Sequence, residues 1–116
     1  VLRKGRPFLA LAATGGVNTI APLAHMLIDI IEHGHGLPQS FASPRLICRE
    51  RGALVVQKTL PPTVRRGLQK LGHVIELAGQ GQELPGPVLG IQVDPQGGGL
   101  TGCVDMRRDG GASAGY

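Results

Sequence analysis

The most constraining feature of this sequence is a junction near its start, where one apolar segment turns through two adjacent glycines directly into another. Residues 7–13 show no polar alternation, which predicts a short strand buried on both faces. A helix is predicted to begin at Asn18 or Thr19, because Asn is a good N-cap residue. The pair Gly15-Gly16 therefore has to join a strand to a helix with almost no intervening loop.

The rest of the chain predicts an α+β fold. The first helix ends at Gly34 or Gly36, since glycine commonly follows the last helical turn. Residues 37–44 predict at most a short helical turn, because each proline pushes the residue before it toward extended geometry. Strands are predicted at 45–49, 53–59, 73–78, 87–94 and 100–105, and a second helix at 63–71. This order favours helices packed on a largely antiparallel sheet over a regular βαβ alternation.

Length and composition predict one globular domain with one core. The chain has 116 residues, 41% of them hydrophobic and 17% charged, with a formal net charge of +4. These values are typical of a folded chain rather than a disordered one. The longest apolar stretch, residues 20–31, is much shorter than the ~20 apolar residues of a membrane span, so no transmembrane helix is predicted. Cys48 and Cys103 lie in apolar strand-like segments and are predicted to be buried free thiols. Because the chain begins with Val1 rather than Met, we expect it to start within a longer protein.

The glycine pair is the best candidate for chemistry. Two adjacent residues without Cβ let the backbone turn sharply and bring its N–H groups close to a ligand. The start of a helix adds donors without intrahelical partners and the positive end of the helix dipole. Gly15 and Gly16 could therefore hold an anion or a developing oxyanion. A purely structural turn is the alternative reading of the same residues.

Other candidate sites are weaker. The segment 32–35, Glu-His-Gly-His, contains possible metal ligands but has no second ligand cluster at a suitable spacing, so no metal or cofactor is predicted. Basic groups lie at residues 3–6 and 65–70, but one Tyr and two Phe provide almost no surface for base stacking. Nucleic-acid binding is therefore not expected. No serine lies in a nucleophile-elbow motif.

Several short segments, in order over nearly the whole chain, carry a family resemblance. The most specific are the glycine pair, the Pro44-Arg45 step after the first helix, and residues 107–116, which read Arg-Arg-Asp-Gly-Gly-Ala-Ser-Ala-Gly-Tyr. The remaining ones are residues 7–11, His35-Gly36, and residues 71–74, which read Leu-Gly-His-Val. Together they resemble the C-terminal part of the small subunit of γ-glutamyltransferases, also called γ-glutamyltranspeptidases.

The resemblance implies an N-terminal-nucleophile hydrolase with an αββα sandwich, of which residues 1–116 would be a single partial domain. Such enzymes are made as precursors that cleave themselves, so that a threonine becomes the first residue of the small subunit. This threonine attacks the γ-glutamyl amide of glutathione-like donors, and the acyl group passes to water, an amino acid or a peptide. The freed α-amine serves as the base, so no separate triad and no cofactor are required.

By the same resemblance, Gly15 and Gly16 are the catalytic oxyanion-hole residues of this segment. The implied partners are the large subunit and the N-terminal part of the small subunit, both from the same precursor, and a γ-glutamyl small molecule as substrate. The family is usually periplasmic, secreted or membrane-anchored, which is the localisation the resemblance suggests.

The sequence also departs from the family pattern. The nucleophilic threonine and the substrate-binding Ser-Ser segment lie upstream of the part that resembles this chain, and Val1 cannot replace the threonine. Val17 stands where a small hydroxyl residue commonly follows the glycines. We therefore predict that the 116-residue chain alone is inactive. The sequence leaves two choices open at this point. The chain is either a fragment of an enzyme or a decayed homologue, and its function is either that of an enzyme segment or that of a noncatalytic anion-binding or structural domain.

Overall fold

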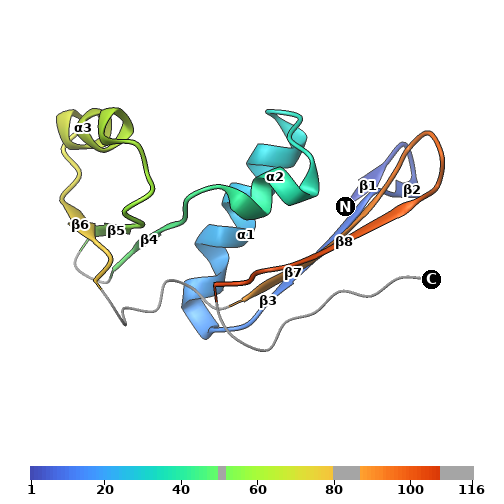
Figure 1. Cartoon of the computed structure of the whole chain (residues 1–116), viewed down its shortest axis with the longest axis horizontal. Coiled ribbons are helices and arrows are strands. Elements are labelled where there is room, and N and C mark those ends of the chain that lie inside the picture. Colours follow the sequence, from blue (N-terminus) through green and yellow to red (C-terminus); the bar gives the residue numbers. More distant parts are fainter. Residues whose placement is uncertain (50–51, 80–86, 108–116) are drawn as a thin grey trace.

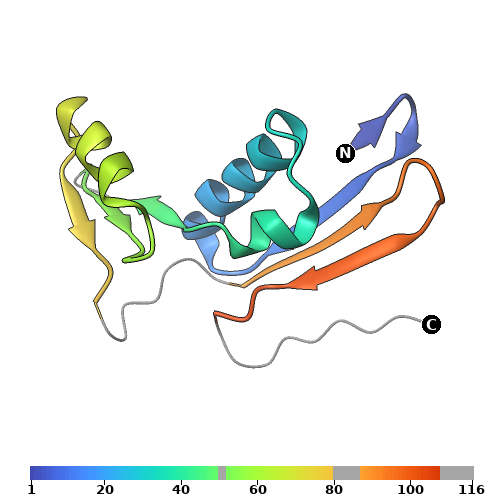
Figure 2. The same cartoon turned by 45° about the horizontal axis from the view of Figure 1, so that its top comes forward.

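The strand before the glycine pair joins the C-terminal strands in one antiparallel sheet. The computed structural model describes residues 1–49, 52–79 and 87–107. In it, β3 (Leu9–Ala13) pairs with β7 (Val88–Val93), which pairs with β8 (Leu100–Val104). Figure 2 shows α1 (Ile20–Ile31) and α2 (Leu37–Ala42) on the same face of this sheet. A first hydrophobic core lies between the sheet and the two helices.

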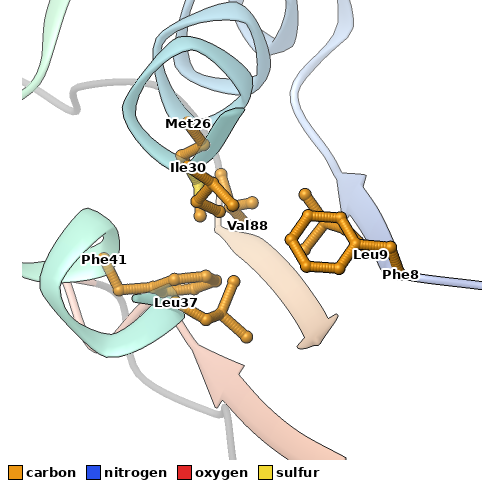
Figure 3. Packing of buried hydrophobic residues seen from close by; sticks show 7 residues of the cluster. All are labelled: Phe8, Leu9, Met26, Ile30, Leu37, Phe41 and Val88. Atoms are coloured by element: carbon orange, nitrogen blue, oxygen red, sulfur yellow. The ribbon is translucent and has the colours of Figure 1, made fainter. Parts of the chain in front are cut away.

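This first core is built from three directions (Figure 3). Met26 and Ile30 are one helical turn apart on α1 and point together toward the sheet, as expected for residues four positions apart. Phe41 and Leu37 repeat this spacing on α2. The sheet side of the cluster contributes buried apolar side chains at Phe8, Leu9 and Val88.

The opposite face of the same sheet is apolar but uncovered by the described residues. Side chains alternate between the two faces of a strand, so every second residue of β3 and β7 lies on this face. Leu89 and Ile91 are 47% and 49% exposed, and Leu100 of β8 is 71% exposed. The prediction that β3 is buried on both faces is therefore wrong for this chain, because Ala10 and Ala12 are exposed. The sequence shows no alternation here because both faces of the strand are apolar.

A second sheet follows α2 in the chain. β4 (Leu46–Cys48) and β5 (Leu54–Val56) form an antiparallel pair, and β6 (Ile75–Leu77) pairs with β5 in parallel. The parallel step is possible because α3 (Pro62–Lys70) provides the crossover between β5 and β6. Figure 1 shows this sheet and α3 beside α1, on the side away from β8.

The second sheet has a hydrophobic cluster of its own, so the prediction of a single core is also wrong. Its buried members are Leu54, Val56 and Leu60, with Leu68 of α3 packed against them. α3 itself contains no buried residue. Two sheets that share no strand each need their own apolar cover, and the length of the chain alone could not reveal this division.

Several local predictions are confirmed and others are corrected. The predicted strands and both predicted helices are present, but α2 is a six-residue helix rather than a single turn. A short hairpin of β1 (Leu2–Arg3) and β2 (Arg6–Pro7) was not expected. Both cysteines are free, as predicted, but Cys48 is exposed because the alternation of β4 turns Ile47 inward instead. No helix in the described part of the chain is long and apolar enough to cross a membrane.

Candidate functional site

The backbone at the glycine pair has a conformation that few other residues adopt. Gly15 has φ 126° and ψ 23°, and Gly16 has φ 61°. Positive φ values of this kind bring Cβ into steric conflict with the backbone, so glycine is the favoured residue at both positions. The end of β3 is fixed by the Thr14 N–H, which donates to the Pro87 carbonyl at 3.3 Å. The turn therefore starts from a fixed point at the end of the sheet.

The helix after the turn begins in two stages. A 3₁₀ turn, η1 (Gly16–Thr19), leads directly into α1. The predicted cap by Asn18 is wrong, since neither η1 nor α1 has a side-chain cap hydrogen bond. The Thr19 hydroxyl donates instead to the Gly16 carbonyl at 2.8 Å. No side chain therefore occupies the amide donors at this helix start.

The two glycine amides have no acceptor within the described residues. Hydrogen bonds of the turns and loops include none donated by the N–H groups of Gly15 or Gly16 among residues 1–49, 52–79 and 87–107. A Cβ built on Gly16 would meet no atom within 4 Å. The backbone thus holds two adjacent N–H groups without an acceptor among the described residues, at the positive end of a helix. This arrangement can bind an anion or stabilise an oxyanion.

A buried charge cluster was not among the sites predicted from the sequence. Arg45 and Asp105 are 2% and 4% exposed, and Arg107 extends the cluster toward the surface. The Arg107 Nη1 donates to both carboxylate oxygens of Asp105 at 2.9 Å, and its Nη2 donates to the Ser43 carbonyl at 2.8 Å. In the sequence, Arg45 and Arg107 stood out only as parts of the segments that carry the family resemblance, because the residues that pair with them are far along the chain.

Burial changes the proton affinity of this cluster. It lowers the pKa of Arg45, as does the neighbouring Arg107, while Asp105 and Asp29 oppose the shift. Burial also lowers the pKa of His25, followed by the charge of Arg45, with Asp29 again opposing. Both shifts arise because a low-dielectric environment disfavours the charged form of a basic group.

The other candidate segments do not assemble into sites. His33 and His35 have ring centroids 6.1 Å apart, and the His35 Nδ1 lies 3.9 Å from a carboxylate oxygen of Asp29. No three metal-binding side chains come together in the part of the chain that the structure describes. The two basic groups lie far apart, one on the β1–β2 hairpin and the other on α3 at the opposite end of the molecule (Figure 1). The described chain therefore offers no single basic face.

Comparison with known proteins assigns nearly the whole chain to one family. The sequence profile described as gamma-glutamyltranspeptidase matches residues 1–115. The chain belongs to the γ-glutamyltranspeptidase family. A search of curated proteins found no match to this chain. Of the C-terminal segment that carries part of the resemblance, residues 107–116, only Arg107 falls within the described residues.

Solved structures of γ-glutamyltranspeptidases share this fold. An acivicin-inhibited γ-glutamyltranspeptidase has 25% sequence identity and a TM-score of 0.81, over 94% of this chain and 58% of that one. A mutant Helicobacter pylori γ-glutamyltranspeptidase has 25% identity and a TM-score of 0.80, over 93% of this chain and 58% of that one. A cephalosporin acylase from Bacillus halodurans has 23% identity and a TM-score of 0.81, over 98% of this chain and 22% of that one.

These matches confirm the predicted fold class. Helices pack on largely antiparallel sheets, as in the N-terminal-nucleophile hydrolase structures of the γ-glutamyltranspeptidases. The chain spans little more than half the length of the first two of these relatives, at 58% of each.

Proposed function

We propose that this chain is the C-terminal segment of the small subunit of a γ-glutamyltranspeptidase-like enzyme and forms one wall of its active site. Two observations support a partial domain. The chain spans 58% of related γ-glutamyltranspeptidase chains. One face of the β3-β7-β8 sheet carries exposed large apolar side chains and is uncovered by the described residues, and monomeric proteins rarely leave large apolar patches exposed. A second sheet, from the rest of the same precursor, would cover it in an αββα sandwich.

In this proposal, the amides of Gly15 and Gly16 form the oxyanion hole, and the observation that carries it is their lack of an acceptor among the described residues. A threonine at the start of the small subunit, outside this chain, attacks the γ-glutamyl carbonyl carbon. Its α-amine takes the hydroxyl proton and then passes it to the departing amine. The glycine amides stabilise the carbonyl oxygen, which carries a negative charge in the tetrahedral intermediate between these two proton transfers.

The substrates that fit this role are γ-glutamyl amides such as glutathione, with water, amino acids or peptides as acceptors. The acyl-enzyme forms when the C–N bond breaks, and it is resolved when the acceptor attacks the same carbonyl. The oxyanion hole serves both steps, because each passes through a tetrahedral intermediate. A periplasmic, secreted or membrane-anchored location follows from family membership and belongs to the same proposal.

The test uses the precursor that contains this segment, with release of 4-nitroaniline from γ-glutamyl-4-nitroanilide as the assay. We expect activity from the matured precursor and none from the 116-residue chain alone. Activity of the isolated chain would contradict the proposed external nucleophile. A matured precursor that binds small anions but never releases 4-nitroaniline would instead support the noncatalytic anion-binding reading.

A matched pair of variants tests the glycine role itself. Gly16 and Gly34 have φ values of 61° and 69°, and a Cβ on either meets nothing within 4 Å. Alanine therefore introduces similar backbone strain at both positions, of about 1–2 kcal/mol. Alanine keeps the amide N–H, but relief of the strain at positive φ turns this N–H away from the oxyanion, so we expect Gly16→Ala to lower kcat by up to about 100-fold, the loss expected when one oxyanion donor is removed. Gly34→Ala, at the far end of α1, should leave kcat nearly unchanged, and an equal loss in both variants would refute the assignment.

A further inference from the structure

The β1–β2 hairpin places two arginines directly opposite each other. Arg3 and Arg6 are cross-strand partners in its register, so their side chains leave the hairpin on the same face. Like charges at directly opposite positions destabilise a strand pair. Arg3, Lys4 and Arg6 are all exposed, and none of their side chains forms an ion pair or a hydrogen bond with the described residues. The hairpin thus carries positive charge that the described part of the chain does not neutralise.

The tip of the same hairpin contains a residue that its backbone conformation does not favour. Lys4 has φ 51° and Gly5 has φ 76°, two consecutive positive values as in a type I′ turn. Asn or Asp normally precedes the glycine in such turns, because these short side chains tolerate the left-handed region. The lysine is therefore disfavoured by the backbone, as the opposed arginines are by their charge. Both choices add positive charge at a cost to the hairpin, which is the pattern expected where residues serve binding rather than folding.

These basic side chains line a groove, called here the hairpin groove. It has a volume of about 910 Å³ and is lined by residues within 3–8 on one side and within 93–98, the end of β7 and the turn toward β8, on the other. Figures 1 and 2 show both segments at the same end of the sheet, and β3 leads from this end to the glycine pair at the other. The hairpin groove is therefore separate from the candidate oxyanion hole.

The hairpin groove combines an excess of positive charge with apolar walls. Asp94 is the single acid among the described residues that line it, and its Oδ1 already accepts the Gln96 N–H at 2.9 Å. Three basic side chains against one carboxylate leave an excess of two positive charges. The Arg3 guanidinium carbon lies 3.8 Å from the centroid of the Phe8 ring, a contact that positions the cation while its N–H groups have no acceptor among the described residues.

A short acidic peptide fits these properties. The volume lies at the upper end of the range of small-molecule pockets, about 300–1,000 Å³, so the groove has room for a chain segment rather than for one small anion. Arginine pairs with carboxylates through two parallel N–H groups, and the apolar walls at Pro7 and Val93 suit the methylene groups of glutamate. A single-stranded nucleic acid fits less well, because the Phe8 ring is 4% exposed and covered by Arg3, so no base can stack on it.

We propose that the hairpin groove binds an acidic peptide of a separate polypeptide, whose carboxylates pair with Arg3, Lys4 and Arg6. The inference does not rest on the proposed function, because the groove is lined by described residues and lies at the opposite end of β3 from the glycine pair. A separate polypeptide is the assigned source, since in the proposed function the remainder of the precursor packs on the free sheet face and completes the site at the glycine pair. The bound carboxylates would offset the repulsion between the two opposed arginines.

The test measures how tightly the full-length protein binds N-acetyl hexaglutamate with a fluorophore at its C-terminus, by fluorescence anisotropy at low ionic strength. The peptide is α-linked and has no free amine, so it can be neither a γ-glutamyl donor nor an acceptor. Lys4→Asn combined with Arg6→Gln removes two charges and places a favoured residue at the positive-φ position, and it should raise Kd by about 10-fold. Arg66→Gln combined with Lys70→Asn removes the same charge from exposed positions on α3 and should change Kd by less than about 2-fold.

A variant that gains affinity separates the loss of this contact from a loss of folding. Asp94→Asn removes the single carboxylate among the described lining residues and should lower Kd by about 3-fold, whereas Glu76→Gln, at an exposed position on β6, should leave it unchanged. The proposal is overturned if both double variants weaken binding equally or if Asp94→Asn does not tighten it. A wild-type Kd above about 1 mM also overturns it, as when a segment of the precursor already fills the groove. Competition by hexathymidylate that matches the unlabelled peptide would assign the groove to nucleic acid instead.

Discussion

Substitution of Gly90 tests whether the first core is packed as closely as the structure indicates. Gly90 lies in β7, the central strand of its sheet, paired with Leu11 of β3. A Cβ at this position would lie 3.0 Å from Leu11 Cδ2, 3.0 Å from Leu37 Cδ1 and 3.1 Å from Phe41 Cε2. Ordinary carbon contacts are about 3.5–4.0 Å, so all three side chains would have to move.

The magnitude follows from two opposing effects. Overpacking a well-filled core costs about 1–3 kcal/mol. Replacing glycine by alanine also reduces the entropy of the unfolded chain, which stabilises the protein by about 0.4–1 kcal/mol. Since Leu11 lies on β3 while Leu37 and Phe41 lie on α2, the three side chains cannot move away together, and overpacking should dominate. We therefore expect Gly90→Ala to destabilise the protein by about 1–2 kcal/mol.

Gly67→Ala is the matched control, because a Cβ on Gly67 meets nothing within 4 Å and the residue lies inside α3. It should stabilise the protein by about 0.5–1 kcal/mol, the usual gain in a helix interior. The assay is urea unfolding of the full-length precursor with both variants in parallel, followed by circular dichroism. The reasoning is refuted if Gly90→Ala is as stable as Gly67→Ala, since the strand would then have room for a side chain.

Two further predictions concern the buried charges. The pKa of folded His25 is lowered below its ordinary value of 6.5, so the folded state binds this proton less readily than the unfolded state. Stability should therefore fall as the pH drops through about 6.5 and below, and His25→Gln should reduce this dependence in urea unfolding measured at pH 7.5 and 5.5. An equal slope in both proteins would exclude His25 as its source. Asp105→Asn should destabilise the protein by about 3–5 kcal/mol in the same unfolding assay, because it leaves two arginines without their shared carboxylate. Asp94→Asn, at an exposed position, should stay within about 0.5 kcal/mol, and similar losses in the two variants would contradict the argument.

Local chemistry made much of the fold and one candidate site predictable. The apolar segment before Gly15 and the positive-φ turn at Gly16 depend on neighbours along the chain, so their patterns in the sequence were sufficient. The same holds for the ends of α1 and α3, where Gly34 and Gly72 adopt positive φ after the last turns. The error at Asn18 was also local, because the 3₁₀ turn η1 displaced the start of the α-helix beyond it.

The charge cluster could not be predicted in this way. Arg45 follows a proline and begins an apolar strand, a position that normally suggests an exposed base. Its burial depends on β8 and on Asp105 just beyond it, and the Arg107 contact to Ser43 joins residues 64 positions apart. No periodicity in the sequence encodes such a pairing, since it exists only after β7 and β8 have joined β3.

The sequence by itself determined the strand–glycine–helix junction, the α+β order of elements and the residues that carry the family resemblance, because each depends on backbone preference or on adjacent side chains. Only the tertiary structure decided that there are two sheets with separate cores, that one sheet face lacks a cover among the described residues, and that two side-chain nitrogens of the buried Arg45 lack an acceptor there. These properties arise where segments distant in the chain pack together. The free energy of such packing depends on which surfaces come into contact, and the local sequence does not encode this.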